Sequence, residues 1–528
     1  MSQHLQQHLQ RLDRAEAKPL LREIGRGIEK ESLRVTPEGK LARTPHPVGL
    51  GSALAHGSIT TDYSEALLEF ITPVSHSIED SLAELENIHR YTYGEIGDEM
   101  LWAASMPCIV SGDAGIPVAE YGSSNVARMK TIYRYGLGHR YGRLMQAIAG
   151  IHYNFSMPHA FWEQEWEALG RPGKLKHHIT ERYLDLIRHF RRYSWLLIYL
   201  YGASPAVCAS FLRGRDSHCL QPFDEHSNSL YMPHATSLRM GDLGYNSEAQ
   251  KGLNVCYNCL DSYVETLREA IMQPHPAYKA IPHGENGEYQ QLKDSLLQIE
   301  NEFYSPIRPN RVTHSGETPL AALRRGGVEY VEVRCVDVSP FHAVGLDAQQ
   351  IRFMDTFLLY CLFSESPDCD DHDQAMQAAN LEAVVNRGRK PGLMLQTAEG
   401  SQSLQDWATG LLSAMAPIAR MLDETHETDS YSGALQIQQA KVDDPELTPS
   451  ARVLREMREQ QVPFFRLAMN YSERWAEQFR SEAAPAAVTR RLREEAERSL
   501  QAQAEIEAAD DLSFEQYLAN FYAQYAAV

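Results

Sequence analysis

The chain has 528 residues, of which 43% are hydrophobic and 23% are charged, values typical of a globular protein with a large core. Acidic residues outnumber basic residues by 70 to 50, which gives a net charge of −20 and a sequence pI near 5.5. A surface this negative repels phosphate backbones and anionic lipid, so we expect neither nucleic acid nor a membrane as a partner.

The first segment, MSQHLQQHLQRLDRAEAKPL, has leucines at positions 5, 9 and 12, which predict an amphipathic helix. It lacks the basic and apolar regions of a signal peptide, and no later run approaches the roughly 18 apolar residues of a membrane span. Eight cysteines are scattered along the chain, and one CxxC, at Cys256 and Cys259, is a weak indication of zinc. We therefore predict a cytoplasmic protein with reduced, mostly structural thiols.

The expected elements alternate irregularly along the chain. Two strand-like runs, GIEKESLRV and LLEFITPV, flank the Gly- and Pro-rich loop TPHPVGLGSALAHGS, and residues 76–96 have helical spacing with a Ser-x-x-Asp cap at Ser77. VEYVEVRCVDVSP (328–340) alternates like a strand. Further helices are expected near 177–203, 248–271, 346–365 and 405–422. Because the βαβ rhythm is missing, we predict an α+β fold with a mostly antiparallel sheet.

No internal repeat and no long Pro- or Ser-rich linker divides the chain, so we expect a single catalytic body over residues 1–528. The charged, helix-favouring residues 440–528 are interpreted as a C-terminal helical cover rather than a catalytic unit. The acidic run SESPDCDDHD (364–373) is interpreted as a solvated loop, since its carboxylates lack the spacing and Gly of an EF-hand.

The stretch GRGIEKESLRV sets Glu29 and Glu31 two positions apart. On a strand they share one face, roughly 6.5 to 7 Å apart, and two unpaired carboxylates placed in a sheet in this way repel each other. The alternative is a solvent-facing strand with Lys30 and Arg34 on the other side, since glutamates usually lie in water.

A second carboxylate lies in an apolar setting. Glu69 is flanked by Leu67, Leu68, Phe70 and Ile71, a run typical of a buried strand, and Asp62 and Glu65 lie just upstream. A carboxylate in such a run needs an ion-pair partner, a proton or a metal ion.

The predicted strand VEYVEVRCVDV carries a third candidate carboxylate, Glu332. Strict alternation puts Tyr330, Glu332, Arg334 and Val336 on one face. Glu332 and Arg334 either form a simple ion pair or, as the functional interpretation, hold a metal ion and a phosphate respectively.

The short strand GIHYNFS offers His152 and Asn154 on one face, although a lone His is more often a core residue than a ligand. Oxygen ligands with one imidazole suit Mg²⁺ or Mn²⁺ better than zinc, and magnesium suggests phosphates. Because the chain has neither GxxxxGK[ST] nor a complete GxGxxG, a nucleotide would need a site unlike a P-loop or a Rossmann crevice.

Nine ordered segments resemble the proteobacterial type of glutamate-cysteine ligase, also called gamma-glutamylcysteine synthetase. They are GRGIEKESLRV, ITTDYSEALLEFITP, SMPC, YGLGHRYG, MQAIAGIHYNFS, YGASPA, ATSLRMGDLGY, QIENEFYSPIRP and GGVEYVEVRCVD. The similarity is dense over residues 21–365, which would form the core with the active-site motifs, and continues more loosely toward the C-terminus. It implies a glutamine synthetase-like fold, in which a curved, mostly antiparallel sheet lines the active site and helices lie outside.

The resemblance also implies an activity and a set of residues. The enzyme would use ATP, with Mg²⁺ or Mn²⁺, to join the γ-carboxylate of L-glutamate to L-cysteine through γ-glutamyl phosphate, the first step of glutathione synthesis. The implied metal ligands are Glu29, Glu31, Asp62, Glu69, His152 and Glu332, and Glu332 and Arg334 would be catalytic. The implied substrate contacts are Arg239, Asn154, Tyr63, Tyr133, Leu137, Tyr245 and Tyr304, with Tyr63 at a position where the family has Phe.

Two rival functions remain at this point. One is a ligase of the same chemistry that prefers a different amine, and the other is a non-catalytic protein that senses a nucleotide or metal ion. The second predicts missing ligands, and all six are present. The resemblance further makes feedback inhibition by glutathione an expectation, and we expect a monomer.

Overall fold

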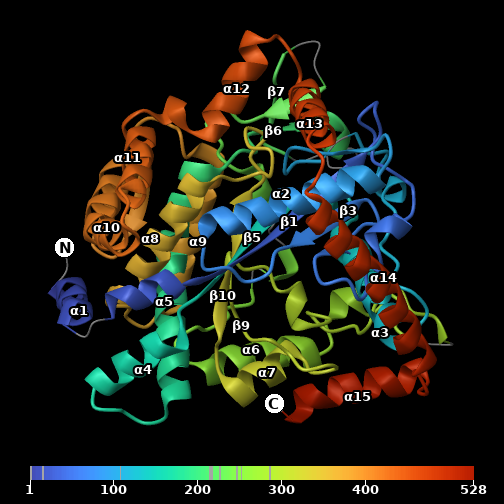
Figure 1. The fold of residues 1–528 in the computed structure, drawn as a ribbon, viewed down its shortest axis with the longest axis horizontal. Helices are drawn as coiled ribbons and strands as arrows, with labels where there is room; N and C mark the ends of the chain where they lie inside the picture. The colour runs from blue at the N-terminus through green and yellow to red at the C-terminus, as the bar shows by residue number, and fades with distance from the viewer. Residues whose placement is uncertain are drawn as a thin grey trace.

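The computed structural model describes residues 3–14, 17–107, 109–212, 218–224, 228–244, 248–250, 252–284 and 287–527. Within these ranges a seven-stranded sheet runs through the centre of the molecule, and helices surround it (Figure 1). The strand order is β2-β3-β1-β5-β10-β9, with β4 paired to the end of β1, and every pair is antiparallel. The sheet strands are β1 (Gly25–Val35), β2 (Ile59–Thr61), β3 (Leu67–Ile71), β4 (Met100–Leu101), β5 (Gly150–Ser156), β9 (Ile307–Asn310) and β10 (Tyr330–Asp337). The predicted combination of helices with an antiparallel sheet is confirmed.

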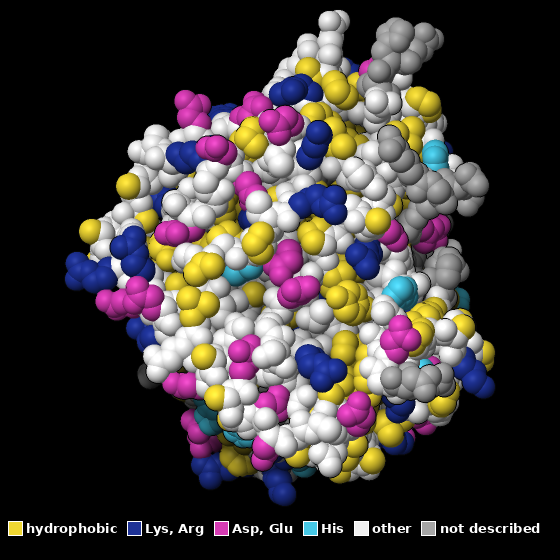
Figure 2. Space-filling view, turned by 90° about the vertical axis from the view of Figure 1, so that its right-hand side faces the viewer, with side chains coloured by type: hydrophobic (Ala, Val, Ile, Leu, Met, Phe, Trp, Pro, Cys, Tyr) yellow, Lys and Arg dark blue, Asp and Glu magenta, His cyan; other side chains and the backbone are white. Residues whose placement is uncertain are grey.

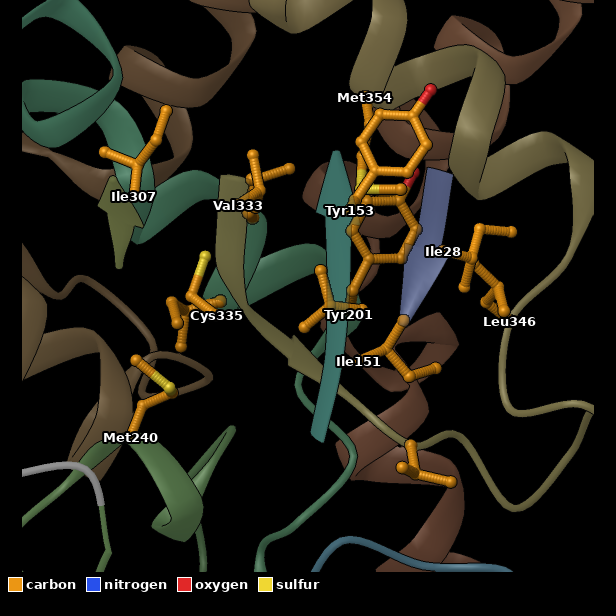
Figure 3. Packing of buried hydrophobic residues seen from close by; sticks show 14 of the residues in the cluster. Ile28, Ile151, Tyr153, Tyr201, Met240, Ile307, Val333, Cys335, Leu346 and Met354 are labelled. Carbon is orange, nitrogen blue, oxygen red and sulfur yellow. The ribbon is translucent and has the colours of Figure 1, made fainter. Parts of the chain in front are cut away.

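The sheet has one apolar and one polar face. Ile28, Ile151, Tyr153 and Val333 are fully buried on the apolar face, where they pack beneath helices (Figure 3). Helix α2 (Ile78–Glu95) lies against β1 and β3, and α5 (Leu175–Tyr201) lies against β9 and β10. Helix α8 (Ala348–Phe363) packs on α2 and on α5. The alternation of side chains along each strand therefore leaves the carboxylates for the opposite face.

Strand β10 departs from strict alternation. Val333 is paired with Tyr153 but Val336 with Ile151, so β10 contains one extra residue between these pairs. Val336 therefore lies on the apolar face with Ile151, and its predicted place beside Glu332 is wrong. A β-bulge of this kind accommodates an unpaired residue and re-aims the side chains around it.

The long helices confirm most of the predicted ones. Helix α2 begins after Ser77, whose hydroxyl accepts from the amide of Asp80, and α5, α8 and α10 (Leu404–His426) correspond to three others. The remaining helices are α1 (Gln3–Arg14), α3 (Asn125–Tyr141), α4 (His159–Ala168), α6 (Leu260–Met272), α7 (Pro319–Gly326), α9 (Asp371–Arg387), α11 (Ser430–Asp443), α12 (Pro449–Glu459), α13 (Phe464–Ser481), α14 (Ala486–Ala508) and α15 (Phe514–Ala527). Two small sheets join β6 (Ala206–Cys208) to β8 (Ser229–Tyr231) and β7 (Gln221–Pro222), and β11 (Met394–Thr397) to β12 (Gly400–Ser403).

Two segments differ in the structure from what the sequence predicts. The helix expected over 248–271 is a 3-10 turn at Glu248–Gln250 and an α-helix only from Leu260, because the side chain of Asn258 bonds to the backbone of Cys369 and Cys259 is extended at the N-cap. The acidic run 364–373 is not entirely a loop, since its last residues begin α9 and Asp370 caps that helix by accepting from the amide of Asp373. Carboxylates are favourable at a helix N-terminus, which explains this use of the run.

The face of the molecule drawn in Figure 2 carries charges of both signs. On the face drawn in Figure 2, outside the grey atoms, Lys and Arg side chains lie scattered among Asp and Glu rather than in a continuous basic area. The described helices include none with the length and apolar character of a membrane span. The assignment of residues 440–528 as a non-catalytic cover stays a prediction, although α12 to α15 do occupy that range.

A buried ion pair ties the apolar face of the sheet to α8. Arg26 Nε donates to Asp355 Oδ2 at 2.9 Å, and Arg26 Nη2 lies 2.8 Å from the same oxygen as an ion pair. The hydroxyl of Tyr153 donates to Asp355 Oδ1 at 2.6 Å. The Arg26 side chain is 1% exposed and that of Asp355 is 0% exposed. Removing either partner would leave an uncompensated charge in the core.

We therefore expect Asp355→Ala to lower the free energy of unfolding by about 3–5 kcal/mol, because Arg26 loses its counterion in the core. Thermal and urea unfolding measure this loss. The matched control is Glu494→Ala, which breaks an exposed pair with Arg498 and should change stability by less than about 0.5 kcal/mol. Equal effects of the two substitutions would contradict the proposed importance of the buried pair.

Candidate active site

A cavity of about 570 Å³ opens on the polar face of the sheet. The predicted site residues that line it are Glu29, Glu31, Asp62, Tyr63, Glu69, Tyr133, Leu137, His152, Arg239, Tyr304, Glu332 and Arg334. Asn154 does not line the cavity, although its side chain bonds to one of the carboxylates that do. Tyr245 lies outside the described residues.

Strand pairing brings the acidic side chains together. Glu31 is opposite Glu69 across β1 and β3, Glu29 is opposite His152 across β1 and β5, and Glu332 is opposite Asn154 across β5 and β10. Directly opposed residues of an antiparallel pair lie on the same face, so four strands contribute to one cluster. Segments that are far apart in the chain thus form one site.

His152 is at the centre of this cluster. Its Nδ1 is 3.3 Å from Glu29 and 3.2 Å from Glu332, while its Nε2 is 3.8 Å from Glu31. Two groups have ligand atoms within 4.8 Å of one another, namely Glu29, His152 and Glu332, and Glu31, Glu69 and His152. Such a set of carboxylates with one imidazole suits a hard divalent cation. Asp62 belongs to neither group but lines the same cavity.

Neighbouring polar groups hold three of the carboxylates in place. Asn154 Nδ2 donates to Glu29 Oε1 at 2.7 Å, and Asn310 Nδ2 donates to Glu332 Oε2 at 2.7 Å. The amide of Gly150 donates to Glu31 Oε2 at 2.5 Å. The other oxygen of each carboxylate lies toward His152. The orientation of these three carboxylates is therefore set by groups of the sheet.

The carboxylates differ in how readily they ionise. Burial and the charges of Glu29, Asp62 and Glu31 raise the pKa of Glu69 well above its ordinary value. Burial and the charge of Asp62 also raise the pKa of Glu31. Burial alone would raise the pKa of Glu332, but Arg334, His152, Arg308 and a hydrogen bond from Asn310 lower it to about 2. The cluster is therefore an anionic site in which Glu31 and Glu69 need a proton or a cation.

Arginines face the carboxylates. Arg334 forms an ion pair with Glu332, and Arg239 donates through Nη2 to the backbone oxygen of Arg334 at 2.9 Å. Arg239 also lies 3.9 Å from the buried carboxylate of Asp337. Its guanidinium crosses β5 at Gly150, where an added Cβ would come within 2.0 Å of Nη2. The missing side chain of Gly150 thus leaves room for the guanidinium of Arg239 in its present position.

The solvent-facing alternative for β1 is wrong. Lys30 is 3% exposed and Arg34 is 1% exposed, because Lys30 donates to Ser32 and contacts His89, while Arg34 pairs with Glu99. Both faces of β1 are buried, one by helices and one beneath the cavity. The burial of both faces of β1 cannot be predicted from alternation alone, since charged residues occur on both faces of the strand.

Tyr63, Tyr133, Leu137 and Tyr304 form a further part of the cavity lining, which we call the aromatic wall. Tyr133 and Leu137 lie four residues apart on α3 and so share one side of that helix. Tyr304 accepts a hydrogen bond from Gln146 Nε2 at 3.0 Å, and Tyr63 is 1% exposed. Burial raises the pKa of Tyr63 and of Tyr133 above the ordinary value, so both phenols are neutral.

Sequence reasoning missed several lining residues. Arg308 and Asn310 alternate on β9 opposite Glu332 and Tyr330, a pattern visible in the letters IRPN once that strand is recognised. Gln146 and Arg134 also line the cavity. They lie outside the sheet strands, at a short 3-10 helix and on α3, where no periodic signal distinguishes a cavity residue from a surface residue.

A polar sheet face with clustered carboxylates, an imidazole and arginines is typical of an enzyme that binds a divalent cation together with an anionic substrate. The sequence profile of the family described as glutamate-cysteine ligase matches residues 9–384. The chain belongs to this family.

Individual proteins of this family are similar to the chain over nearly its full length. The chain is 51% identical over 524 residues to the glutamate–cysteine ligase of Alcanivorax borkumensis, covering 98% of this chain and 99% of that one. It is 49% identical to the ligase of Pseudomonas paraeruginosa, with 99% and 98% covered. The crystal structure of glutamate–cysteine ligase from Francisella tularensis in complex with AMP matches with a TM-score of 0.89 and 37% identity, covering 96% of this chain and 98% of that one.

We expect Glu69→Gln to stabilise the protein when divalent cations are removed, because the substitution relieves repulsion among buried carboxylates. The raised pKa of Glu69 means that its contribution to stability is lost as the pH rises through that pKa. The wild-type melting temperature without metal should therefore fall between about pH 5 and 8, and the variant should recover roughly 1–3 °C.

Addition of Mn²⁺ should reverse this order, since a cation that binds the folded cluster stabilises it by mass action. The wild type should gain more melting temperature than Glu69→Gln does. The control, Glu459→Gln, replaces an exposed carboxylate on α12 and should match the wild type in both conditions. An equal response of all three proteins to Mn²⁺ would remove Glu69 from the cation site.

Proposed function

We propose that this chain is an ATP-dependent ligase that joins the γ-carboxylate of L-glutamate to the amine of L-cysteine, giving γ-glutamylcysteine, ADP and phosphate. This reaction is the first step of glutathione synthesis. The observation that carries the proposal is the convergence of the carboxylates, His152 and the arginines in one cavity of a chain from this family. The finer description of the fold, a curved sheet similar to that of glutamine synthetase, belongs to the same proposal.

Charge explains why such a site suits the reaction. ATP and glutamate are both anions, so the attacking γ-carboxylate and the γ-phosphate repel each other. Glu29, Glu31, Asp62, Glu69, His152 and Glu332 would hold Mg²⁺ or Mn²⁺, as the donor set fits hard cations. When bound, the metal offsets the charge of the phosphate oxygens.

The arginines act on the remaining charge. Arg334 lies on the same strand face as Glu332, where its guanidinium would meet the transferring phosphate and stabilise the charge that builds up in the transition state. Glu332 orients that guanidinium through their ion pair. Arg239, held by the carbonyl of Arg334, would contact phosphate or substrate charge nearby.

The product of this transfer is γ-glutamyl phosphate, which the neutral amine of cysteine then attacks with loss of phosphate. The wall formed by Tyr63, Tyr133, Leu137 and Tyr304 would hold the cysteine side chain, since aromatic and aliphatic groups suit a small apolar thiol. Asn154 would help to hold glutamate, although its Nδ2 is already bonded to Glu29. Tyr245 keeps its proposed role in the acceptor pocket from the family resemblance alone.

Three properties stay predictions from sequence. They are feedback inhibition by glutathione, whose γ-glutamyl-cysteinyl part resembles the product, a monomeric state and a cytoplasmic location. Activity that is unchanged in millimolar glutathione would contradict the first. None of the three affects the assignment of the reaction.

ADP release by purified protein with Mg-ATP and L-glutamate tests the function. We expect strong stimulation by L-cysteine, weaker stimulation by 2-aminobutyrate, which keeps a small apolar side chain, and little by ammonia. Strong stimulation by a different amine would retain the chemistry and change the acceptor. Binding of ATP without any stimulated release would favour the sensing protein instead.

We expect Arg334→Ala to lower kcat by about 10²- to 10³-fold, because a donor aimed at transition-state charge is lost. Arg334→Lys should recover part of the rate, since it restores the charge but not the planar fork. The control is Arg325→Ala, which breaks a partly exposed pair with Glu317 away from the described cavity lining and should leave kcat unchanged. Near-normal turnover of Arg334→Ala, measured as cysteine-dependent ADP release, would remove Arg334 from this role.

A further inference from the structure

The last helix of the chain is bonded to a loop that forms part of the cavity wall. This loop, residues 298–304, contributes Glu300, Asn301, Glu302 and Tyr304 to the lining. From α15, Tyr525 donates its hydroxyl to Glu300 Oε2, and Tyr522 donates to the backbone oxygen of Gln298 at 3.0 Å. Two hydroxyls more than two hundred residues away along the chain thus hold both the start and the middle of the loop.

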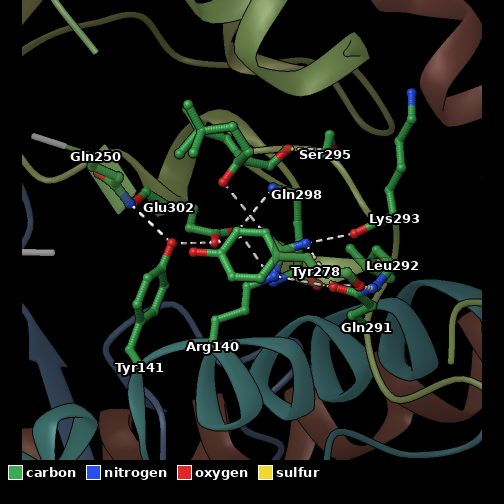
Figure 4. Close-up of polar contacts among 12 residues, drawn as sticks. Arg140, Tyr141, Gln250, Tyr278, Gln291, Leu292, Lys293, Ser295, Gln298 and Glu302 are labelled. Carbon is green, nitrogen blue, oxygen red and sulfur yellow. Dashed lines mark hydrogen bonds and ion pairs between the residues drawn. The ribbon is translucent and has the colours of Figure 1, made fainter. Parts of the chain in front are cut away.

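The contacts continue from the loop to the aromatic wall. Gln298, labelled with Glu302 in Figure 4, donates through its backbone amide to Glu302 Oε2 at 2.7 Å. Its side-chain Nε2 donates to the backbone oxygen of Tyr133 at 3.2 Å. Gln298 lies so close to α3 that a Cβ at Gly136 would come within 2.2 Å of its Oε1. The loop and the helix that carries Tyr133 are therefore fixed against each other.

Glu302 is the buried centre of this arrangement. It forms an ion pair with Arg140 at 2.9 Å, both side chains being fully buried, and accepts from the hydroxyl of Tyr141 at 2.7 Å (Figure 4). Gln250 donates to that hydroxyl at 3.1 Å, and its own Oε1 accepts from the amide of Tyr304. A fully bonded buried network of this kind holds its members in one arrangement.

We propose that α15 positions the acceptor-amine pocket, and that Tyr522 and Tyr525 are positioning residues that set the affinity for the amine without touching it. The reason is that α15 is linked by hydrogen bonds to the loop that ends in Tyr304 and, through Gln298, to Tyr133. The two groups of candidate cation ligands around His152 come instead from β1, β3, β5 and β10, on the sheet side of the cavity. The assignment of the wall to the amine rests on the proposed function.

Tyr522→Phe and Tyr525→Phe test the proposal, because each removes one hydroxyl of α15 and keeps the aromatic ring in place. We expect the KM for cysteine and for 2-aminobutyrate to rise by about fivefold or more, while kcat and the KM for ATP change by less than about twofold. Tyr517→Phe, a half-buried tyrosine on the same helix, is the matched control and should behave as wild type. Unchanged KM values, or an equal rise of the KM for ATP, would overturn the assignment.

Hydrogen exchange separates this inference from the proposed function. In both variants the backbone amides of residues 298–304 should exchange faster than in Tyr517→Phe, whichever substrate the enzyme uses. Unchanged exchange would overturn the positioning role even if cysteine is the substrate. A wild-type protein that cysteine does not stimulate would refute the reaction, while faster exchange in the variants would still support the positioning of the loop. If Tyr525→Phe does not fold, Tyr522→Phe alone decides, since it removes only a bond to a backbone oxygen.

Discussion

Repulsion among carboxylates on one sheet face is the constraint on which the rest of this structure depends. Glu31 and Glu69 are opposed across β1 and β3, and burial raises the pKa of both. Such a cluster costs stability unless it binds protons or cations, and its donor set suits a hard divalent ion. The amide of Gly150, Asn154 and Asn310 then orient the carboxylates instead of neutralising them.

The opposite face of the sheet makes this arrangement possible. Ile28, Ile151 and Val333 pack beneath α2, α5 and α8, and the buried pair of Arg26 and Asp355 joins the strands to α8. Burial of this apolar face supplies the stability that an unfavourable polar face requires. The bulge in β10 contributes as well, because it returns Val336 to the apolar side while Arg334 stays on the cavity.

The last described helix, α15, is connected by hydrogen bonds to a loop of the cavity wall. In Figure 1, α14 runs down one side of the molecule and α15 turns beneath it toward α6 and α7. Tyr522 and Tyr525 then reach the loop that carries Glu300 and Glu302. A cover interpretation based on helix-favouring composition misses this, since composition describes where a segment can be helical and not what its tyrosines contact.

The sequence by itself determined the fold class, the two-residue spacing of Glu29 and Glu31, the buried strand around Glu69 and the family. Strand periodicity and ordered motifs carry this information locally. Only the tertiary structure decided that both faces of β1 are buried, that Val336 leaves the face of Glu332, and that Arg308 and Gln146 line the cavity. It also decided that α15 is hydrogen-bonded to a loop of the cavity wall. These features depend on which strands pair, in which register, and on contacts between residues hundreds of positions apart, none of which leaves a periodic signal in the chain.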